Sequence, residues 1–461
     1  MANQLDSETD KRGDRKGWIA AIGVGTLTLI AYEVLLLGFQ QKFTVPFSHG
    51  MSPARLLVST CVVLWVMTRI VGQRSGASTK FFSIVLALFA LGSVMSYATS
   101  MWGGLIPIAR IASDEYLLAQ MLALLIFFFI GAVIRTQKSI EWAVKGLVIG
   151  GSISAFFAVL EFATGVDFAE KLTLPGLKAA SPDLVDDLVR EGVRRAQGSA
   201  GHPLELGAVM TTLIPLAIGI TFVAFESGRK WRLWACTVAL LSAGAIVSVS
   251  RSSIIALGVA LLIMAWRWPV KRVLIATGTA VALTAIAFIS NAKLLNAFAG
   301  IFGSSANDPS IASRARGQQY VAEHYGNHPW FGQGIGTYPI LNQPYLDNEY
   351  LGRLMETGIF GVATLILLLV TALGYALVAA RNHDIAEMES TSVARGGGEI
   401  ARAIAASLTA IIIINTILDT SGFAQITGII WILIGLSAAS WSVSKQSLRS
   451  ARDKGTEAPS H

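Results

Sequence analysis

The residue types best suited to chemistry gather in one polar segment, residues 313–361, which reads SRARGQQYVAEHYGNHPWFGQGIGTYPILNQPYLDNEYLGRLMETGIFG. It combines arginines, histidines, alternating glycines and several carboxylates. Arginine presents a planar, permanently charged fork that matches phosphate oxygens, whereas carboxylates can exchange protons or bind sugar hydroxyls. The segment therefore predicts a site for a phosphorylated ligand beside groups able to do acid/base work.

The elements that must position this segment are membrane-spanning helices. Hydrophobic residues make up 53% of the chain, charged residues only 14%, and the mean hydropathy is +0.59, which excludes an ordinary soluble domain. Apolar runs long enough to cross a bilayer occur at about twelve places. We place these spans near 18–38, 54–72, 81–99, 116–134, 140–163, 203–224, 233–249, 252–266, 271–290, 351–379, 403–418 and 425–443. The expected fold class is an all-α integral membrane protein.

The seventh and eighth runs are short, and only Ser250 and Arg251 separate them. If they formed one span, the topology after them would invert. Lys and Arg are retained on the cytoplasmic side of a membrane, and two separate spans put most basic clusters on the same side as both termini. These clusters are at 11–16, 69–80, 135–138, 229–232, 267–272, 381–402 and 445–454. We therefore expect both spans to exist and both termini to be cytoplasmic.

The chain then divides into alternating membrane and loop segments. They are a cytoplasmic tail (1–17), five spans (18–163), an extracytoplasmic loop (164–202), four spans (203–290), a large extracytoplasmic loop (291–350), three spans (351–443) and a second cytoplasmic tail (444–461). The run from Trp18 is too long for a signal peptide, so it is expected to be retained. No metal-ligand spacing or nucleotide-binding loop is present in the sequence, so we expect no cofactor, no metal and no nucleic acid partner.

The first outer loop contains SPDLVDDLVREGVRRAQG, in which Ser181 and Pro182 form a helix start. Apolar residues at helical spacing predict a helix along the membrane surface that ends in arginines. One interpretation is an amphipathic helix whose arginines merely reach toward water, and the other is a grip for an anion. The arginines concerned are Arg190, Arg194 and Arg195.

Ionisable residues inside the spans cluster toward the outer side of this topology. Charge in hydrocarbon costs several kcal/mol unless it is paired or serves a site. A pump would place such groups nearer the midplane, so this pattern indicates a cavity open at the outer leaflet, with a lipid-linked diphosphate as a fitting ligand. The residues are Glu33, Glu161, Glu205, Glu356, Asp419, Arg55, Arg110, Arg251 and Arg353.

Three blocks of the sequence resemble the O-antigen ligase and O-antigen polymerase superfamily of bacterial envelope glycan assembly. The first is RAQGSAGHPLELGAVMTTLIPLA from Arg195, and the second is SVSRSSIIALGVALLI from Ser248. The third consists of Arg314, HPWFGQGIGTY and NEYLGRLMETGIFG within the polar segment. The resemblance covers residues 195–361 and implies a polytopic fold similar to the GT-C type of glycosyltransferase.

The resemblance also implies an activity and its partners. Such a protein takes a polyprenyl-diphosphate-linked oligosaccharide as donor at the outer face of the bacterial cytoplasmic membrane, and transfers or polymerises the glycan onto a glycan or lipid-glycan acceptor. Arginines of the family hold the diphosphate, which carries over to Arg195, Arg251 and Arg314. Residues expected to support the site or bind the acceptor are Arg110, Arg316, Asn348, Glu349, Arg353 and Glu356.

Asp347 stands where ligases of the family carry a histidine that is proposed to activate the acceptor hydroxyl. A carboxylate can serve as this catalytic base if its pKa is raised, and the adjacent Glu349 could help to raise it. The alternative is that Asp347 is a helix N-cap for the span that follows. Because Asp347 stands in place of this histidine, the sequence also leaves open whether the protein is a ligase or a polymerase.

Other residues of the polar segment have structural alternatives. His328 precedes proline and fits a turn better than a base, and the glycines 332, 334 and 336 suit either a phosphate or a loop. Glu356 is expected to pair with Arg353, Arg314 or Arg251. A different function, a lipid-linked glycan flippase or polysaccharide exporter, would need a charged path through the bilayer, which the sequence does not indicate. A non-catalytic scaffold would leave the outer arginines unexplained.

Overall fold

The computed structural model describes residues 23–46, 51–70, 80–172, 176–179, 189–190, 193–274, 278, 309–389 and 396–456. Most of these residues are helical, which confirms the all-α class. The strands found among them pair two by two and are two residues long: β1 (Phe43–Thr44) with β2 (Lys178–Ala179), and β3 (Val189–Arg190) with β4 (Val193–Arg194).

Seven of the described helices are long and apolar enough to cross a membrane. They are α4 (Lys80–Trp102), α5 (Pro107–Val133), α6 (Gln137–Thr164), α8 (Pro203–Glu226), α14 (Glu349–Glu389), α15 (Gly397–Ile414) and α16 (Ala424–Thr456). Four more apolar helices coincide with other expected spans: α2 (Val24–Gly38), α3 (Pro53–Ile70), α9 (Trp231–Val247) and α10 (Arg251–Ala265). The ninth expected span, 271–290, lies mostly outside the described residues, so the total of twelve stays a prediction.

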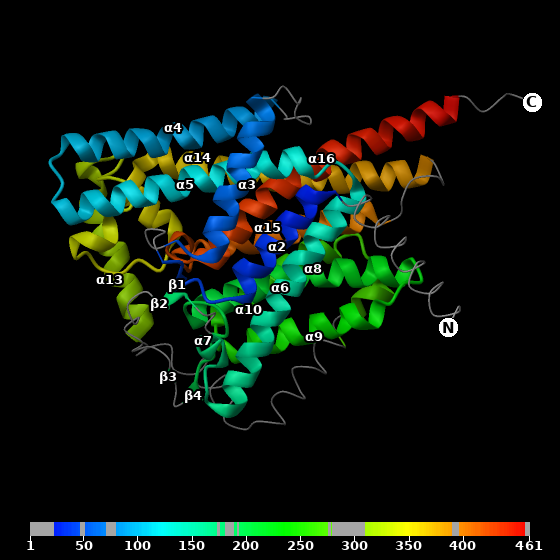
Figure 1. Cartoon of the computed structure of the whole chain (residues 1–461), viewed down its shortest axis with the longest axis horizontal. Coiled ribbons are helices and arrows are strands. Elements are labelled where there is room, and N and C mark those ends of the chain that lie inside the picture. The colour runs from blue at the N-terminus through cyan, green and yellow to red at the C-terminus, as the bar shows by residue number, and fades with distance from the viewer. Residues whose placement is uncertain are drawn as a thin grey trace, which may run out of the picture.

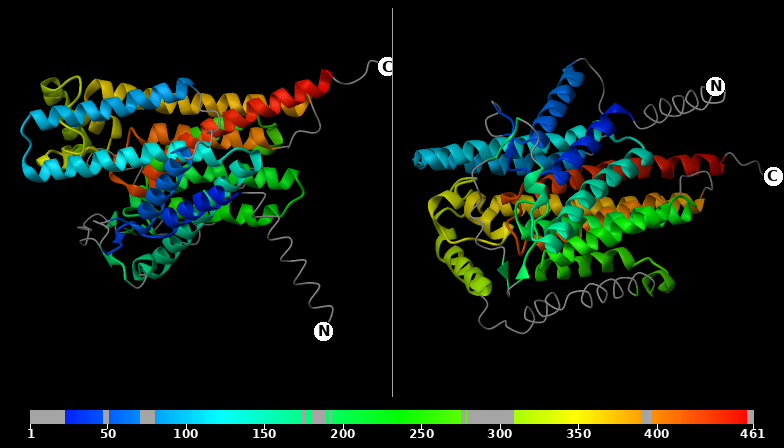
Figure 2. Two further views of the ribbon diagram at one scale, coloured as in Figure 1. Left: turned by 45° about the horizontal axis from the view of Figure 1, so that its top comes forward. Right: turned by 60° about the horizontal axis from the view of Figure 1, so that its bottom comes forward.

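The helix bundle has two distinguishable ends (Figure 1). Helix α13 (Pro309–His324) and the turn between α4 and α5 lie at one end, and the C-terminal ends of α14 and α16 lie at the other. Figure 2 shows the same separation from two further sides. We call the first end the α13 end. The short elements η2 (Tyr325–Asn327) and η3 (Tyr338–Leu341) follow α13 in the chain and lead back to α14.

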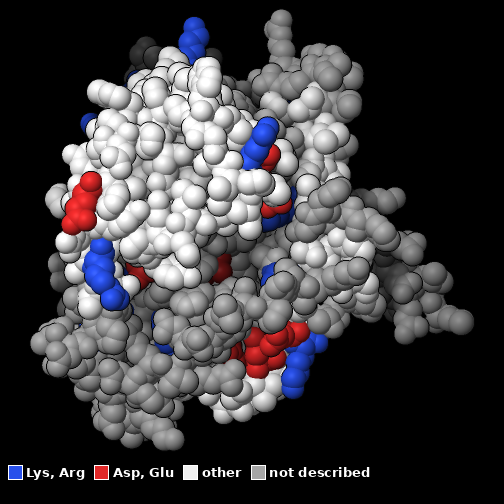
Figure 3. All heavy atoms as spheres, turned by 90° about the vertical axis from the view of Figure 1, so that its left-hand side faces the viewer, with Lys and Arg blue, Asp and Glu red and all other residues white. Residues whose placement is uncertain are grey.

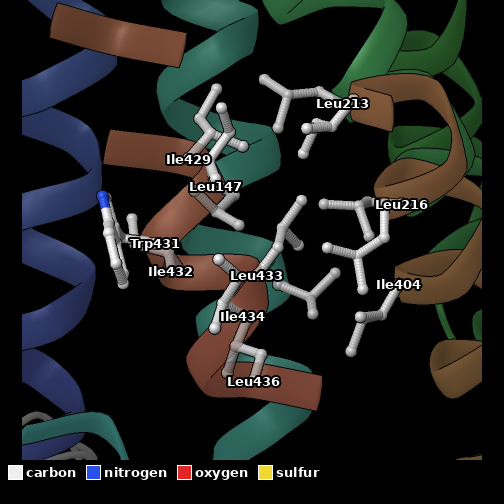
Figure 4. Close-up of a cluster of buried hydrophobic side chains, with 14 of the residues drawn as sticks. Leu147, Leu213, Leu216, Ile404, Ile429, Trp431, Ile432, Leu433, Ile434 and Leu436 are labelled. Atoms are coloured by element: carbon white, nitrogen blue, oxygen red, sulfur yellow. The ribbon is translucent and has the colours of Figure 1, made fainter. Parts of the chain in front are cut away.

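The core of the bundle forms around α16. Its apolar side chains contact those of α6, α8 and α15, as Figure 4 shows for Leu433 with Leu147, Leu216 and Ile404. On another face of α16, Trp431 makes an edge-to-face contact with Phe89 of α4, with ring centroids 5.7 Å apart. Dense packing of this kind fixes the helix positions and therefore the geometry at the α13 end.

The junction between the seventh and eighth expected spans is a genuine break, which confirms that they are two helices. Helix α9 ends at Val247, α10 begins at Arg251, and Val249 between them has a φ of 49°. A β-branched residue in this left-handed region is strained, so neighbouring structure must hold it there. The extended chain at 195–196 does this in part, because the Ala196 N–H donates to the Val247 carbonyl (3.3 Å).

Helix α14 is kinked at Gly358, which has φ 67° and ψ −170°. The loop after α13 docks onto this kink and takes over the backbone hydrogen bonds that the helix loses. Ile359 and Phe360 donate their N–H groups to the carbonyls of Pro329 and Trp330, at 2.8 and 3.2 Å. Gln333 and Gly334 donate theirs to the carbonyls of Met355 and Glu356, at 2.8 and 3.0 Å. The glycine-rich loop is therefore fastened to the start of α14.

The first outer loop differs from the expected surface helix. Around the arginines the chain is extended rather than helical, because β3 pairs with β4 in a tight antiparallel ribbon. The expected helix start at Ser181 and Pro182 lies outside the described residues. The expected helix is therefore wrong at β3 and β4, and Arg195 directly follows a strand.

The docked loop predicts the effect of a substitution at the kink. An added Cβ at Gly358 would overlap the backbone of Trp330, and the positive φ adds strain. We expect Gly358→Ala to lose about 2 kcal/mol or more of stability, measured as a lower Tm of the purified protein in detergent. The matched control is Gly352→Ala in the same helix, where an added Cβ meets open space. Equal Tm values for the two variants would contradict the docking.

Candidate functional site

Four helix N-termini converge at the α13 end, those of α8, α10, α14 and α16. The N–H of Gln425 at the start of α16 donates to the Glu205 carboxylate of α8 at 2.7 Å. The Thr211 hydroxyl of α8 donates to the Ser253 carbonyl of α10 at 3.1 Å. The first N–H of α14 reaches the Asn415 carbonyl, in the loop just before α16, at 2.9 Å. Helix N-termini carry partial positive charge, so this end attracts anions.

Arg195 and Arg251 come to the N-terminus of α10. Arg195 is 3% exposed, and its Nε donates to the Ser248 carbonyl at 3.0 Å, in the turn that ends at Arg251. Helix α10 carries no acidic residue in its first turn. Two guanidinium groups and a helix N-terminus without a carboxylate of its own favour the binding of an external anion here.

Arg314, the third expected phosphate ligand, pairs with Asp347. Its Nε lies 3.3 Å from Asp347 Oδ2, and the two side chains are 35% and 37% exposed. The helix-cap alternative for Asp347 is wrong, because Asn348 caps α14: its Oδ1 accepts the Leu351 N–H at 3.0 Å. Asp347 is thus left with a half-exposed carboxylate beside one arginine, while Asn348 has a structural role.

The buried glutamates at this end bind backbone N–H groups of loops. The acceptors and donors are Glu161 with Gln197 and Gly198 (3.0 and 2.9 Å), Glu205 with Gly201 and Gln425 (2.8 and 2.7 Å), Glu349 with Ser421 (2.9 Å), and Glu356 with Tyr338 (3.1 Å). Among the described residues Glu356 makes no direct salt bridge with an arginine, and the expected pairing is limited to a longer-range electrostatic interaction with Arg353. Carboxylates that were candidates for acid/base work instead hold the loops in place.

Arg353 and Glu349 form a buried ion pair one helical turn apart. Arg353 Nε donates to Glu349 Oε1 at 2.7 Å, and its other nitrogens donate to Gln120 Oε1 (3.1 Å) and the Tyr116 hydroxyl (3.2 Å) of α5. The side chains of the pair are 8% and 4% exposed. Both residues therefore support the site by joining α14 to α5, and Glu349 is engaged inside the protein.

The loop between α15 and α16 and the start of α16, residues 415–425, form a part of the site that the sequence analysis missed apart from Asp419. It reads NTILDTSGFAQ and contains η4 (Thr420–Gly422). Through Ser421 it contacts Glu349 of α14, and through Gln425 it contacts Glu205 of α8. It therefore joins the arginine side of the site, at α8 and α10, to the carboxylate side, at α13 and α14. The signal in the sequence was a polar run between two apolar spans.

The remaining expected residues, Arg110 and Arg316, lie on the surface. Arg110 is exposed in the first turn of α5, and Arg316 is exposed on α13. Figure 3 faces the α13 end and shows acidic and basic side chains there, some recessed below the surrounding uncharged surface. The recessed groups, rather than the two surface arginines, are the ones in a position to exclude water from a ligand.

Comparison with known proteins identifies part of this arrangement. Residues 236–366 match the family model described as O-antigen ligase. We call this matched stretch the O-antigen ligase domain after the family that it resembles. No curated protein matches the chain. The family indicates membrane glycan transfer in cell-surface polysaccharide synthesis in the bacterial inner membrane, with a lipid-linked glycan and a glycan acceptor as partners.

The O-antigen ligase domain supplies only part of the site. The matched residues include Arg251, Arg314, Asp347, Arg353 and Glu356. Arg195, Glu205 and the α15–α16 loop lie outside the matched stretch and meet it through the hydrogen bonds described above. The candidate site is therefore completed by elements from both sides of the domain.

The environment of Asp419 predicts a pH dependence. Burial raises the pKa of this carboxyl well above its usual range, and the charge of Glu349 raises it further. An acid whose pKa is raised by folding stabilises the protein at low pH, and this contribution is lost as the pH rises through the folded pKa. We expect the Tm of Asp419→Asn to be close to that of the wild type at about pH 4 and higher than that of the wild type at about pH 8. A Tm difference that is constant across this range would contradict the assignment.

The Arg353–Glu349 pair predicts a large loss of stability when one partner is removed. Arg353→Met leaves a buried carboxylate without its cation, which costs about 3–5 kcal/mol, and we expect a lower Tm and a lower folded yield. The double variant Glu349→Gln, Arg353→Met should recover much of this loss. The matched control is Arg381→Met, since Arg381 is exposed on the same helix. If Arg353→Met were as stable as Arg381→Met, the Arg353–Glu349 pair would not be needed to hold α14 in place.

Proposed function

We propose that the protein is a glycosyltransferase that takes glycan from a polyprenyl-diphosphate-linked donor and joins it to an acceptor hydroxyl at the outer face of the bacterial cytoplasmic membrane. The observation that carries this proposal is the pairing of Arg314 with Asp347 inside the O-antigen ligase domain, at the same end of the bundle as Arg195 and the start of α10. An anion site and a half-exposed carboxylate within one site are the two parts that such a transfer needs.

The arginine side of the site suits the leaving group. As the bond between the anomeric carbon and the diphosphate oxygen breaks, negative charge grows on the diphosphate. Arg195, Arg251 and the N-terminus of α10 would stabilise that charge, and preorganised electrostatic stabilisation of this kind is usually the largest contribution to catalysis. The lipid chain of the donor can remain in the membrane because the site lies at the end of a bundle of apolar helices.

The carboxylate side suits the acceptor. The acceptor hydroxyl attacks the anomeric carbon, and its proton passes to the carboxylate of Asp347, so that the glycan is transferred and polyprenyl diphosphate is released. Arg314 holds the Asp347 carboxylate in one position through their ion pair. A ligase and a polymerase share these steps and differ only in the acceptor that is presented to Asp347.

The proposal predicts separate effects for the two sides of the site. Purified protein in lipid nanodiscs is given a polyprenyl-diphosphate oligosaccharide and a panel of glycan and lipid-glycan acceptors, and product and released polyprenyl diphosphate are measured. Asp347→Asn should lower kcat by about 100-fold or more, because a positioned base contributes that much. Arg251→Ala should weaken both donor binding and kcat.

The matched control for Asp347→Asn is Glu323→Gln, which removes an exposed carboxylate from α13 and should leave the rate unchanged. If the wild type releases no polyprenyl diphosphate with any donor, the proposed glycosyltransferase activity is refuted. Full activity of Asp347→Asn would refute the role of Asp347 as the base. The diphosphate site would then be tested by the activity of Arg251→Ala alone.

A further inference from the structure

A cavity of about 340 Å³ opens at the α13 end, apart from the charged groups described above. It lies between the last turn of α4, the turn after it, helix α13 and the loop that docks onto α14. Thr99, Leu105, Tyr320, His324, Asn327 and Gln343 are among the residues that line it. A volume of this size is within the usual range for small-molecule sites in proteins.

The described residues that line the cavity carry hydroxyl, amide, imidazole and aromatic groups, and none of them is Asp, Glu, Lys or Arg. A phosphate or a carboxylate placed here would lose its hydration without meeting the ammonium or guanidinium group of a Lys or Arg among the described lining residues, which is unfavourable. A sugar ring without charge has the complementary chemistry, because its hydroxyls pair with amides and its C–H faces pack against aromatic rings.

The walls of the cavity are fixed before any ligand arrives. The rings of Tyr320 and His324 are stacked with centroids 4.0 Å apart, and His324 Nδ1 lies 2.8 Å from the Tyr320 carbonyl. A carbonyl only accepts, so Nδ1 donates to it, and Nε2 is left to bond a hydroxyl of a ligand. Gln333 and Gln343 hold each other through two amide hydrogen bonds of 3.0 Å. Such preorganisation lowers the entropy lost on binding.

The cavity is connected to the reaction site by α13. Tyr320 and His324 follow Arg314 by six and ten residues on this helix, which corresponds to about 9 and 15 Å along its axis. Arg314 in turn binds Asp347, the residue on the acceptor side of the site. Helix α13 therefore contributes residues both to the cavity and to the contact with Asp347, at a separation that a short run of linked sugar rings can span.

We propose that this cavity is a subsite for uncharged sugar rings of the acceptor glycan, behind the ring whose hydroxyl reacts. The inference rests on the proposed glycan transfer and adds the class of acceptor to it: a glycan whose rings near the reacting end are uncharged, rather than one built of uronic acids. Its role is to hold the acceptor chain in register with Asp347, so it determines acceptor affinity and not the rate of the chemical step.

Binding without any donor tests the subsite directly. The full-length protein in nanodiscs is applied to an array of bacterial oligosaccharides, half of them neutral and half containing uronic acids. We expect the wild type to retain neutral oligosaccharides in preference. His324→Ala, which removes the stacked ring, and Leu105→Trp, which fills the cavity from the α4–α5 turn, should each weaken this binding by about tenfold or more. The matched control is Ile106→Trp, in the same turn but not among the lining residues, and should bind like the wild type.

Two variants on different elements keep the test decisive if one of them fails to fold, since Leu105 lies outside any helix. Preference for uronic acids, no retention of neutral oligosaccharides, or unchanged binding in both cavity variants would overturn the subsite. In the transfer assay the same variants should raise the acceptor KM and leave kcat and the donor KM unchanged. If both cavity variants lose oligosaccharide binding but the wild type shows no transfer, the subsite stands and the proposed function is refuted. If the wild type transfers glycan and both variants have the wild-type acceptor KM, the proposed function stands and the subsite is refuted.

Discussion

The arrangement at the α13 end depends on one constraint: backbone N–H groups that are buried away from water need acceptors from the protein itself. The chain leaves helical geometry there several times, before α8, between α9 and α10, at the kink of α14 and after α15. Buried glutamates supply acceptors before α8 and after α15, and the kink of α14 is satisfied by a docked loop. The same groups that allow the breaks also fasten neighbouring elements to each other.

This constraint decides which charges remain for a ligand. Glu205 and Glu349 each stand in the first turn of a helix, so their charges offset the positive N-terminal ends of α8 and α14. Glu205 also takes the first N–H of α16. The N-terminus of α10 has no such acid, and Arg195 and Arg251 lie beside it. The positive potential of four converging helices is therefore concentrated at one of them.

The glycines of the loop after α13 are explained by packing against α14. Its glycines resemble a phosphate-binding loop in spacing, but Gly332 packs directly on the carbonyl of Glu356, where any side chain would overlap the backbone of α14. The loop thereby fixes the first turns of α14, which follow Asp347 in the chain. The motif matters for the site because it fixes the geometry, and the cavity beside it follows from the same docking.

The sequence by itself determined the all-α membrane class and the approximate positions of most described helices, and it singled out the arginines and the aspartate of the proposed site, because hydrophobic runs and charged residues in apolar surroundings are local properties that can be read in order. It also predicted the break before Arg251 from the distribution of basic residues. Only the tertiary structure decided which carboxylates are structural, that Asn348 and not Asp347 caps α14, and that the α15–α16 loop joins the two sides of the site. These outcomes depend on which backbone groups lack partners after the helices pack, and partners far apart in the chain leave no local pattern in the sequence.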